Sequence, residues 1–102
     1  MLVRFHNASD TAYTSLEADP SGRGQNLLPF GMLEPGAYSG YIEVPEARVY
    51  PVIDVSCFYA HYTFTPGTAT PVIENDPGHY TYHVDLVAGE TGNELTVTQS
   101  AD

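Results

Sequence analysis

The chain has 102 residues and carries thirteen acidic side chains against three basic ones, a formal net charge of −10. All three cations are arginines (Arg4, Arg23 and Arg48), and lysine is absent. This balance excludes a basic nucleic-acid surface, a Schiff-base lysine and a phosphate-loop lysine. Apolar residues make up 42% of the chain, which is typical of a globular protein, and its length fits one domain, residues 1–102. The apolar runs are short, so we expect no membrane insertion.

The distribution of proline and glycine predicts an all-β fold. Eight prolines and nine glycines interrupt the chain, and the runs between them are rich in Val, Ile, Thr, Tyr and Phe. Strands are expected, in chain order, at residues 2–6, 12–17, 27–30, 38–44, 48–64 with a bulge near Ser56 and Cys57, 72–73, 79–87 and 94–99. We therefore predict a single antiparallel β-sandwich, immunoglobulin-like or related, of seven to nine short strands.

Alternation assigns faces to several of these strands. In the segment 79–87 it directs one set of side chains to the core, namely Tyr80, Tyr82, Val84 and Leu86. The outward set in the same segment is His79, Thr81, His83 and Asp85. At residues 12–17 the pattern places Ala12 and Leu16 on one face and Tyr13 on the other. Cys57 is the only cysteine, and its apolar neighbours predict a small residue buried in a strand of the core.

The histidines suggest one candidate metal site. His79 and His83 have the spacing of a helical zinc pair, but on a strand their side chains would lie about 13 Å apart, too far to share one metal. His83 and Asp85 would lie closer, and His61 could join them from a paired strand. The competing interpretation is that these are polar residues on the outer face of a sheet. The acidic turns lack the alternating aspartates of a dedicated calcium loop.

Tyrosine provides the candidate partner-binding residues. The chain has eight tyrosines and no tryptophan. Tyr41 and Tyr59 are expected to be exposed, because their in-phase neighbours are Glu43 and His61, and with His79 they are the predicted partner- or ligand-binding residues. Most other tyrosines should be buried or half-buried. The absence of tryptophan argues against a carbohydrate platform, and no nucleophile motif is present, so we expect neither an enzyme nor a cofactor.

Three segments carry a resemblance to known families. The opening Arg4–Asp10 stretch is RFHNASD; the middle contains Phe30-Gly31 and then GAYSGYIEVP at residues 36–45; the late strand has GHYTY at residues 78–82. The first resembles the Arg-x-x-His-Ala-Ser-Pro-Asp start of a bacterial secreted domain family of unknown function, and the Val-Arg-x-x-Asn-Ala start of the related alginate O-acetylation accessory proteins. The other two are similar to the middle and late strands of both groups. The chain departs from them at Glu46-Ala47, where Ala-Gly is usual, and at Asp10, which follows Ser9 without a proline.

The resemblance implies a small, non-enzymatic β-sandwich of the periplasm or cell surface. We therefore expect an accessory module of a bacterial envelope or extracellular protein that contacts a protein partner through a sheet face or edge, in exopolysaccharide modification or export. The alternatives are a metal-binding module for Ca²⁺, Zn²⁺ or Cu²⁺, or a carbohydrate-binding module with a polysaccharide partner. A cytoplasmic location stays open, because residues 1–10 lack the pattern of a signal peptide. The oligomeric state also stays open.

Overall fold

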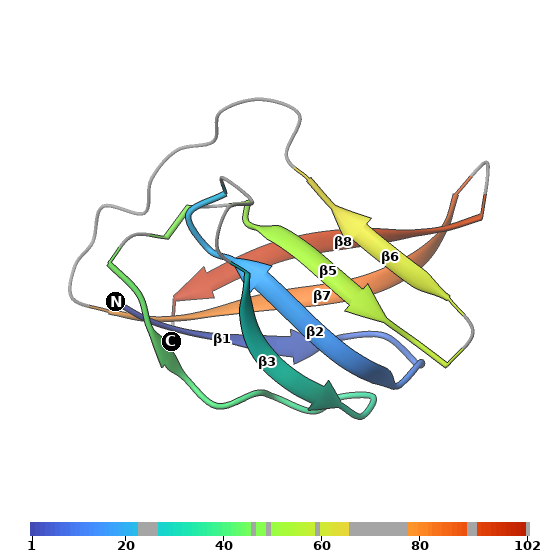
Figure 1. The fold of residues 1–102 in the computed structure, drawn as a ribbon, viewed down its shortest axis with the longest axis horizontal. Coiled ribbons are helices and arrows are strands. Elements are labelled where there is room, and N and C mark those ends of the chain that lie inside the picture. Colours follow the sequence, from blue (N-terminus) through green and yellow to red (C-terminus); the bar gives the residue numbers. More distant parts are fainter. Residues whose placement is uncertain are drawn as a thin grey trace.

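A computed structural model describes residues 1–22, 27–45, 47–48, 50–58, 60–65, 78–89 and 92–101, without the side chains of 88–89 and 92–93. Within these ranges the chain forms eight strands in two layers (Figure 1): β1 (Leu2–Asn7), β2 (Tyr13–Asp19), β3 (Leu28–Leu33), β4 (Ile42–Glu43), β5 (Val52–Ser56), β6 (His61–Phe64), β7 (His79–Gly89) and β8 (Gly92–Ala101). The predicted all-β sandwich is therefore confirmed, with a strand number inside the expected range. The same ranges include no helix of the length and apolarity needed to span a membrane.

Each layer is a four-stranded sheet. The first sheet has the strand order β4-β1-β7-β8, and the second has the order β3-β2-β5-β6 and lies in front of it in Figure 1. Strands β1 and β7 pair in parallel, whereas the other strand pairs are antiparallel. Since β1 lies between β4 and β7, the first residues of the chain are an internal part of their sheet.

The core lies between the sheets and is built from alternate residues of both. Phe5 of β1 is fully buried, with its ring 4.5 Å from that of Phe30 in the second sheet and 5.0 Å from that of Tyr82 in β7. From the second sheet, the Tyr13 hydroxyl donates a hydrogen bond to the Val84 carbonyl across the sandwich, at 2.9 Å. Each large side chain buried here stabilises the fold by about 1.5–3 kcal/mol relative to exposure.

Two predicted strands differ from those observed. The segment 38–44 contributes only β4 and an isolated antiparallel bridge between His6 and Tyr38. The segment 48–64 was predicted to carry a bulge near Ser56 and Cys57, but it contains a β5–β6 hairpin there, in which the Cys57 amide donates to the Ala60 carbonyl at 2.8 Å. The predicted strand at 72–73 lies outside the described residues.

The predicted faces hold for β7 and fail for β2. Tyr80, Tyr82 and Val84 are buried as expected, and Leu86 is partly buried. In β2, however, both Tyr13 and Leu16 are buried. The pairing of β2 with β3 shifts register between these two residues, and such an irregularity breaks the simple alternation of faces.

Candidate functional site

The outer face of the first sheet is built from alternate residues of β1 and β7. Because Val3 and Phe5 point into the core, Arg4 and His6 point away from it. The parallel register places Arg4 opposite Thr81 and His6 opposite His83. Arg4 covers Thr81, which is only 1% exposed, and its Nε donates to the Thr81 Oγ1 at 3.0 Å.

A connecting segment brings tyrosines to the same face. After β3 the chain turns at residues 34–37, where Gly36 has a φ of +81° that favours glycine. Residues 37–39 then run beside the second half of β1, beyond the two residues that pair with β4. The Asn7 amide donates to the Ala37 carbonyl at 2.9 Å, and the Ser39 amide donates to the Phe5 carbonyl at 2.8 Å. This pairing directs Tyr38 onto the outer side of β1.

These residues form one continuous series of contacts, which we call the basic–aromatic row. The ring of His79 meets that of Tyr41 edge-to-face at 5.1 Å, and the Arg4 guanidinium lies 4.8 Å from the centre of Tyr41 and 4.4 Å from that of Tyr38. Tyr38 stacks on His6 at 4.3 Å with an interplanar angle of 10°. His6 in turn meets His83 edge-on at 5.0 Å. The row is therefore Arg4, His6, Tyr38, Tyr41, His79 and His83.

Tyr38 occupies the middle of the row. The Arg4 guanidinium lies 4.4 Å from the centre of its aromatic ring, and the His6 ring stacks on it at 4.3 Å. Both contacting side chains come from β1, two residues apart. The Tyr38 side chain is still 50% exposed.

His6 and His83 end the row in a direct hydrogen bond. Their Nδ1 atoms lie 2.8 Å apart, and the Nε2 of His83 lies 2.9 Å from the Ser100 hydroxyl on β8. The pKa of His6 is lowered, first by desolvation and then by the positive charges that His83 and Arg4 carry or acquire. His6 therefore favours its neutral form, in which one ring nitrogen retains a lone pair.

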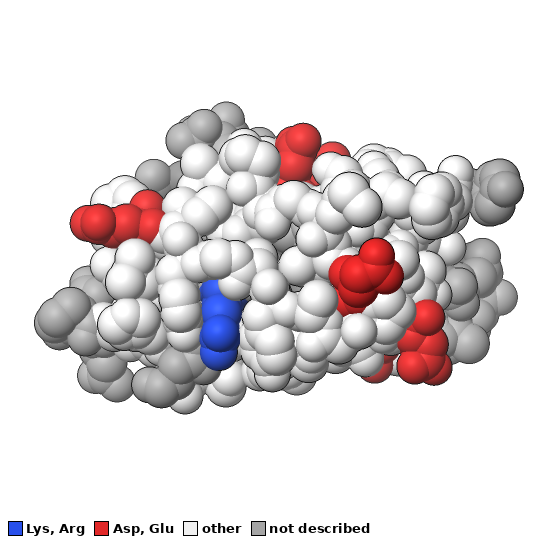
Figure 2. Space-filling model, turned by 90° about the horizontal axis from the view of Figure 1, so that it is seen from below, with Lys and Arg blue, Asp and Glu red and all other residues white. Residues whose placement is uncertain are grey.

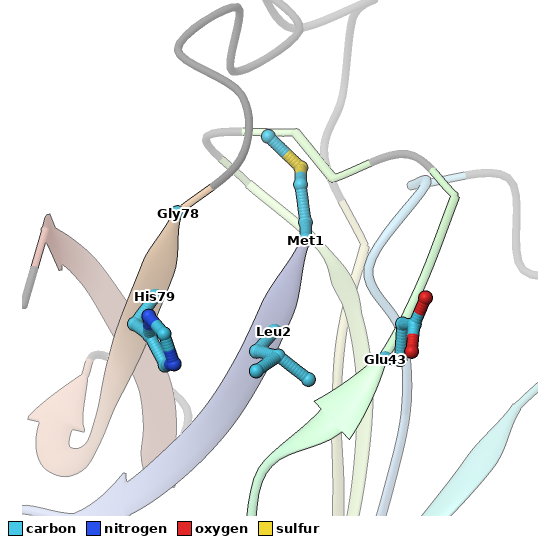
Figure 3. Close-up of a pocket in the computed structure, with 5 residues that line it drawn as sticks. All are labelled: Met1, Leu2, Glu43, Gly78 and His79. Atoms are coloured by element: carbon cyan, nitrogen blue, oxygen red, sulfur yellow. The ribbon is translucent and has the colours of Figure 1, made fainter.

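Two hollows flank the row. The first, of about 330 Å³, is lined by residues of three adjacent strands and their approaches: Met1, Leu2, Glu43, Gly78 and His79. In Figure 3 the Leu2 side chain lies between those of His79 and Glu43, as expected from the register that pairs Leu2 with both. The second hollow, of about 380 Å³, is lined by residues 6–10, Pro35 and Gly36. A ligand at the row can therefore use a recess at either end.

The structure does not assemble the metal site predicted from His61, His83 and Asp85. His61 lies on the outer side of the second sheet, where its Nε2 contacts the Asp54 carboxylate. His83 and Asp85 lie on β7 of the first sheet, so the two parts of the predicted site face away from each other. Across the described residues, no three His, Cys, Asp or Glu side chains are close enough to bind one ion. In the side view of Figure 2 the acidic side chains are scattered rather than gathered.

Two of the three predicted partner-binding residues lie in the basic–aromatic row. Tyr41 and His79 are both exposed and in contact, as parts of one surface, whereas Tyr59 lies outside the described residues. Sequence reasoning missed Arg4, His6 and Tyr38. The alternation of Arg4 and His6 with Val3 and Phe5 was a usable signal for the first two, but the bridge that positions Tyr38 depends on a long-range contact.

Cys57 is partly buried and packs against the core, but it lies at the start of the β5–β6 turn rather than within a strand. Burial raises the pKa of its thiol, which disfavours the thiolate that a reactive cysteine requires. No protein-family model, curated protein or solved structure matches the chain. The family resemblance of its segments therefore stays a prediction.

Proposed function

We propose that this domain is a non-catalytic binding module that contacts a partner protein through the outer face of its first sheet. The observation that carries the proposal is the basic–aromatic row, a continuous series of tyrosine, arginine and histidine side chains on an otherwise acidic domain. Tyrosine and arginine are the residues most enriched at the energetic centres of protein interfaces. Their contacts with each other limit the side-chain entropy that binding would cost.

The geometry of the tyrosines favours a protein over a sugar as the partner. A sugar ring stacks on an open aromatic face, but the Arg4 guanidinium and the His6 ring already lie against Tyr38, and Arg4 also lies over Tyr41. The two tyrosine side chains stay partly exposed, Tyr38 by 50% and Tyr41 by 38%. Groups of this kind suit hydrogen bonds and edge contacts with a polypeptide. These contacts support the protein partner over the carbohydrate alternative.

The hollow beside His79 supplies the apolar part of such an interface. Met1, Leu2 and Gly78 line it, and Glu43 and His79 flank it. Its volume of about 330 Å³ can admit one large apolar side chain, and a buried anchor ringed by polar groups is typical of interface centres. We assign the module to the bacterial envelope or the extracellular space, with a role in exopolysaccharide modification or export, on the resemblance of its segments alone.

A site-specific crosslinking experiment tests the proposal. A photoreactive phenylalanine analogue is placed at Tyr41, in the row, and separately at Thr63, an exposed residue on the second sheet. Each protein is irradiated in an envelope extract of the source cells. We expect a discrete protein adduct from position 41 and none from position 63.

A competition experiment tests whether the adduct formed at position 41 depends on the basic–aromatic row. An excess of unlabelled wild-type protein should suppress it, and an equal excess of a Tyr38→Ala, Arg4→Gln double variant should not. Identical adducts from both positions, or suppression by both competitors, would contradict the proposed surface. Adducts to polysaccharide rather than protein would support the carbohydrate alternative.

A further inference from the structure

The His6–His83 pair has an arrangement that goes beyond a general binding surface. The two rings project from adjacent parallel strands at paired positions, and their Nδ1 atoms face each other at 2.8 Å. Tyr38 restrains the His6 ring by stacking on it, and Ser100 restrains the His83 ring by bonding its Nε2. Both imidazoles are therefore oriented before any ligand arrives.

The Ser100 contact also bears on the protonation state. When the Nε2–H of His83 donates to the Ser100 hydroxyl, the lone pair of the neutral ring lies on Nδ1, toward His6. The His6 Nδ1–H then donates to that lone pair. Metal-binding histidines commonly have this design, in which an outer hydrogen bond fixes the tautomer and the ring orientation.

We propose that His6 and His83 bind a divalent transition-metal ion through their two Nδ1 atoms, with Cu²⁺ preferred. Binding replaces the hydrogen bond between the rings: the metal takes the lone pair of each Nδ1, and the His6 proton moves through solvent from Nδ1 to Nε2, so that both rings stay neutral. Water completes the coordination, since no third metal-binding side chain adjoins the pair in the described ranges. The recess lined by His6, Asp10 and Gly36 gives solvent access to this end of the row.

The two nitrogen ligands select among metals. The present separation of 2.8 Å between the Nδ1 atoms is that of a hydrogen bond, and at metal–nitrogen distances of about 2.0–2.1 Å the two atoms would lie about 2.9–3.3 Å apart. Imidazole nitrogen suits Cu²⁺, Ni²⁺ and Zn²⁺. Cu²⁺ binds nitrogen ligands most tightly among these ions.

The charges around the pair are compatible with a cation. The formal charge of −10 favours cation approach, and Asp85, two residues beyond His83, lies on the same strand face. The positive charge of Arg4, which lies against the Tyr38 ring, opposes it. Calcium, which requires oxygen ligands, should not bind here.

Copper titration of the full chain tests the proposal. Cu²⁺ is added as its glycine complex, to suppress weak adventitious sites, and binding is followed by calorimetry and electron paramagnetic resonance at pH 7.4. We expect one equivalent to bind with a spectrum showing two nitrogen donors. His6→Gln or His83→Gln should weaken binding at least tenfold, and Ser100→Ala, which removes only the outer hydrogen bond, should weaken it about tenfold.

His61→Gln is the matched control, because it removes an exposed histidine from a strand of the second sheet. Loss of binding in this control equal to that in His6→Gln, or an unchanged affinity in His83→Gln, would overturn the proposal, as would the absence of stoichiometric binding. A measurement on the wild-type chain guards against misfolded variants. Paramagnetic broadening of nuclear magnetic resonance signals should centre on residues 6, 83 and 100, and broadening centred elsewhere would also refute the site.

Discussion

The two outer faces of the sandwich differ in how their polar residues are organised. The first sheet presents three of the four histidines: His6 and His79 contact tyrosines, as Arg4 does, and His83 contacts His6. The second sheet presents His61 beside the Asp54 carboxylate, with Glu17 exposed nearby on β2. On the second face an imidazole has an acidic neighbour, which is a common arrangement on a protein surface. On the first face the same residue type is surrounded by aromatic and basic groups.

This difference shows what distinguishes a candidate site from an ordinary polar face. Both faces have outward histidines on strands, and both were consistent with the sequence pattern that predicted His61 and His83 as metal ligands. Among the described residues, the side chains of the first face form a continuous series of contacts, whereas His61 on the second face contacts Asp54. If that series of contacts matters, substitutions in or beneath the row should have effects that matched substitutions on the second face lack.

The largest change in stability is expected at Phe5, the core residue of β1 between Arg4 and His6. Phe5→Ala removes the ring between Phe30 and Tyr82 and should lower the free energy of unfolding by about 3–5 kcal/mol. Urea denaturation measures the change. Thr63→Ala, on the exposed side of the second sheet, is the control and should change stability by less than about 0.5 kcal/mol. A similar loss of unfolding free energy in both variants would contradict the role of Phe5 in joining the two sheets.

The next effect concerns the attachment of the connecting segment. Asn7 is fully buried, and its amide group donates to the Thr11 and Leu33 carbonyls while its oxygen accepts from Ser9. Asn7→Ala leaves these buried groups unpaired and should cost about 1–3 kcal/mol. Thermal unfolding measures it. Asn7→Asp, which retains the acceptor but lacks the donor, should not restore wild-type stability; full restoration would indicate that the two carbonyls do not need this donor.

Tyr38 allows a direct comparison of the two faces. Tyr38→Ala removes the stacking with His6 and the contact with Arg4 and should destabilise the domain by about 1 kcal/mol. Met32 on β3, which is 72% exposed, is the matched site on the second sheet, and Met32→Ala should have an effect below about 0.5 kcal/mol. Equal effects in denaturant titrations would mean that the row does not contribute to stability.

The smallest effect is a pH dependence. Because the folded protein holds the pKa of His6 below its ordinary value, the unfolded chain binds more protons in the interval between the two values, and stability falls as the pH decreases through it. The decline should begin near pH 6.5, the ordinary histidine pKa. His6→Gln should reduce the slope of unfolding free energy against pH in this window. A slope as steep as that of the wild type would assign the dependence to other groups.

The sequence predicted the fold class well because alternation and turn residues are local signals. Tyr80, Tyr82 and Val84 are buried as the alternation predicts. The prediction is wrong at Tyr13, where a shift in β2–β3 register changes the face, and near Ser56 and Cys57, where a hairpin replaces the predicted bulge. Both depend on how one strand pairs with another, which a single sequence does not encode locally.

The candidate site was only partly predictable for the same reason. Tyr41 and His79 were expected from their exposure, but His6 meets His83 only because β1 pairs in parallel with β7. The residues next to His6 and His83 in the sequence do not indicate that β1 and β7 pair. The predicted metal site joined His83 with His61 on the expectation that their strands pair, but His61 lies on β6 of the second sheet.

The parallel pairing of β1 with β7 also constrains the order of folding. The two histidines that meet across it are 77 positions apart in the chain, and joining such distant segments is slow compared with closing hairpins such as β5–β6 or β7–β8. During synthesis, β1 has no β7 to pair with until most of the polypeptide has emerged. Docking of the two strands should therefore be a late event, and an optical probe placed at residue 6 would record completion of the native state rather than its initiation.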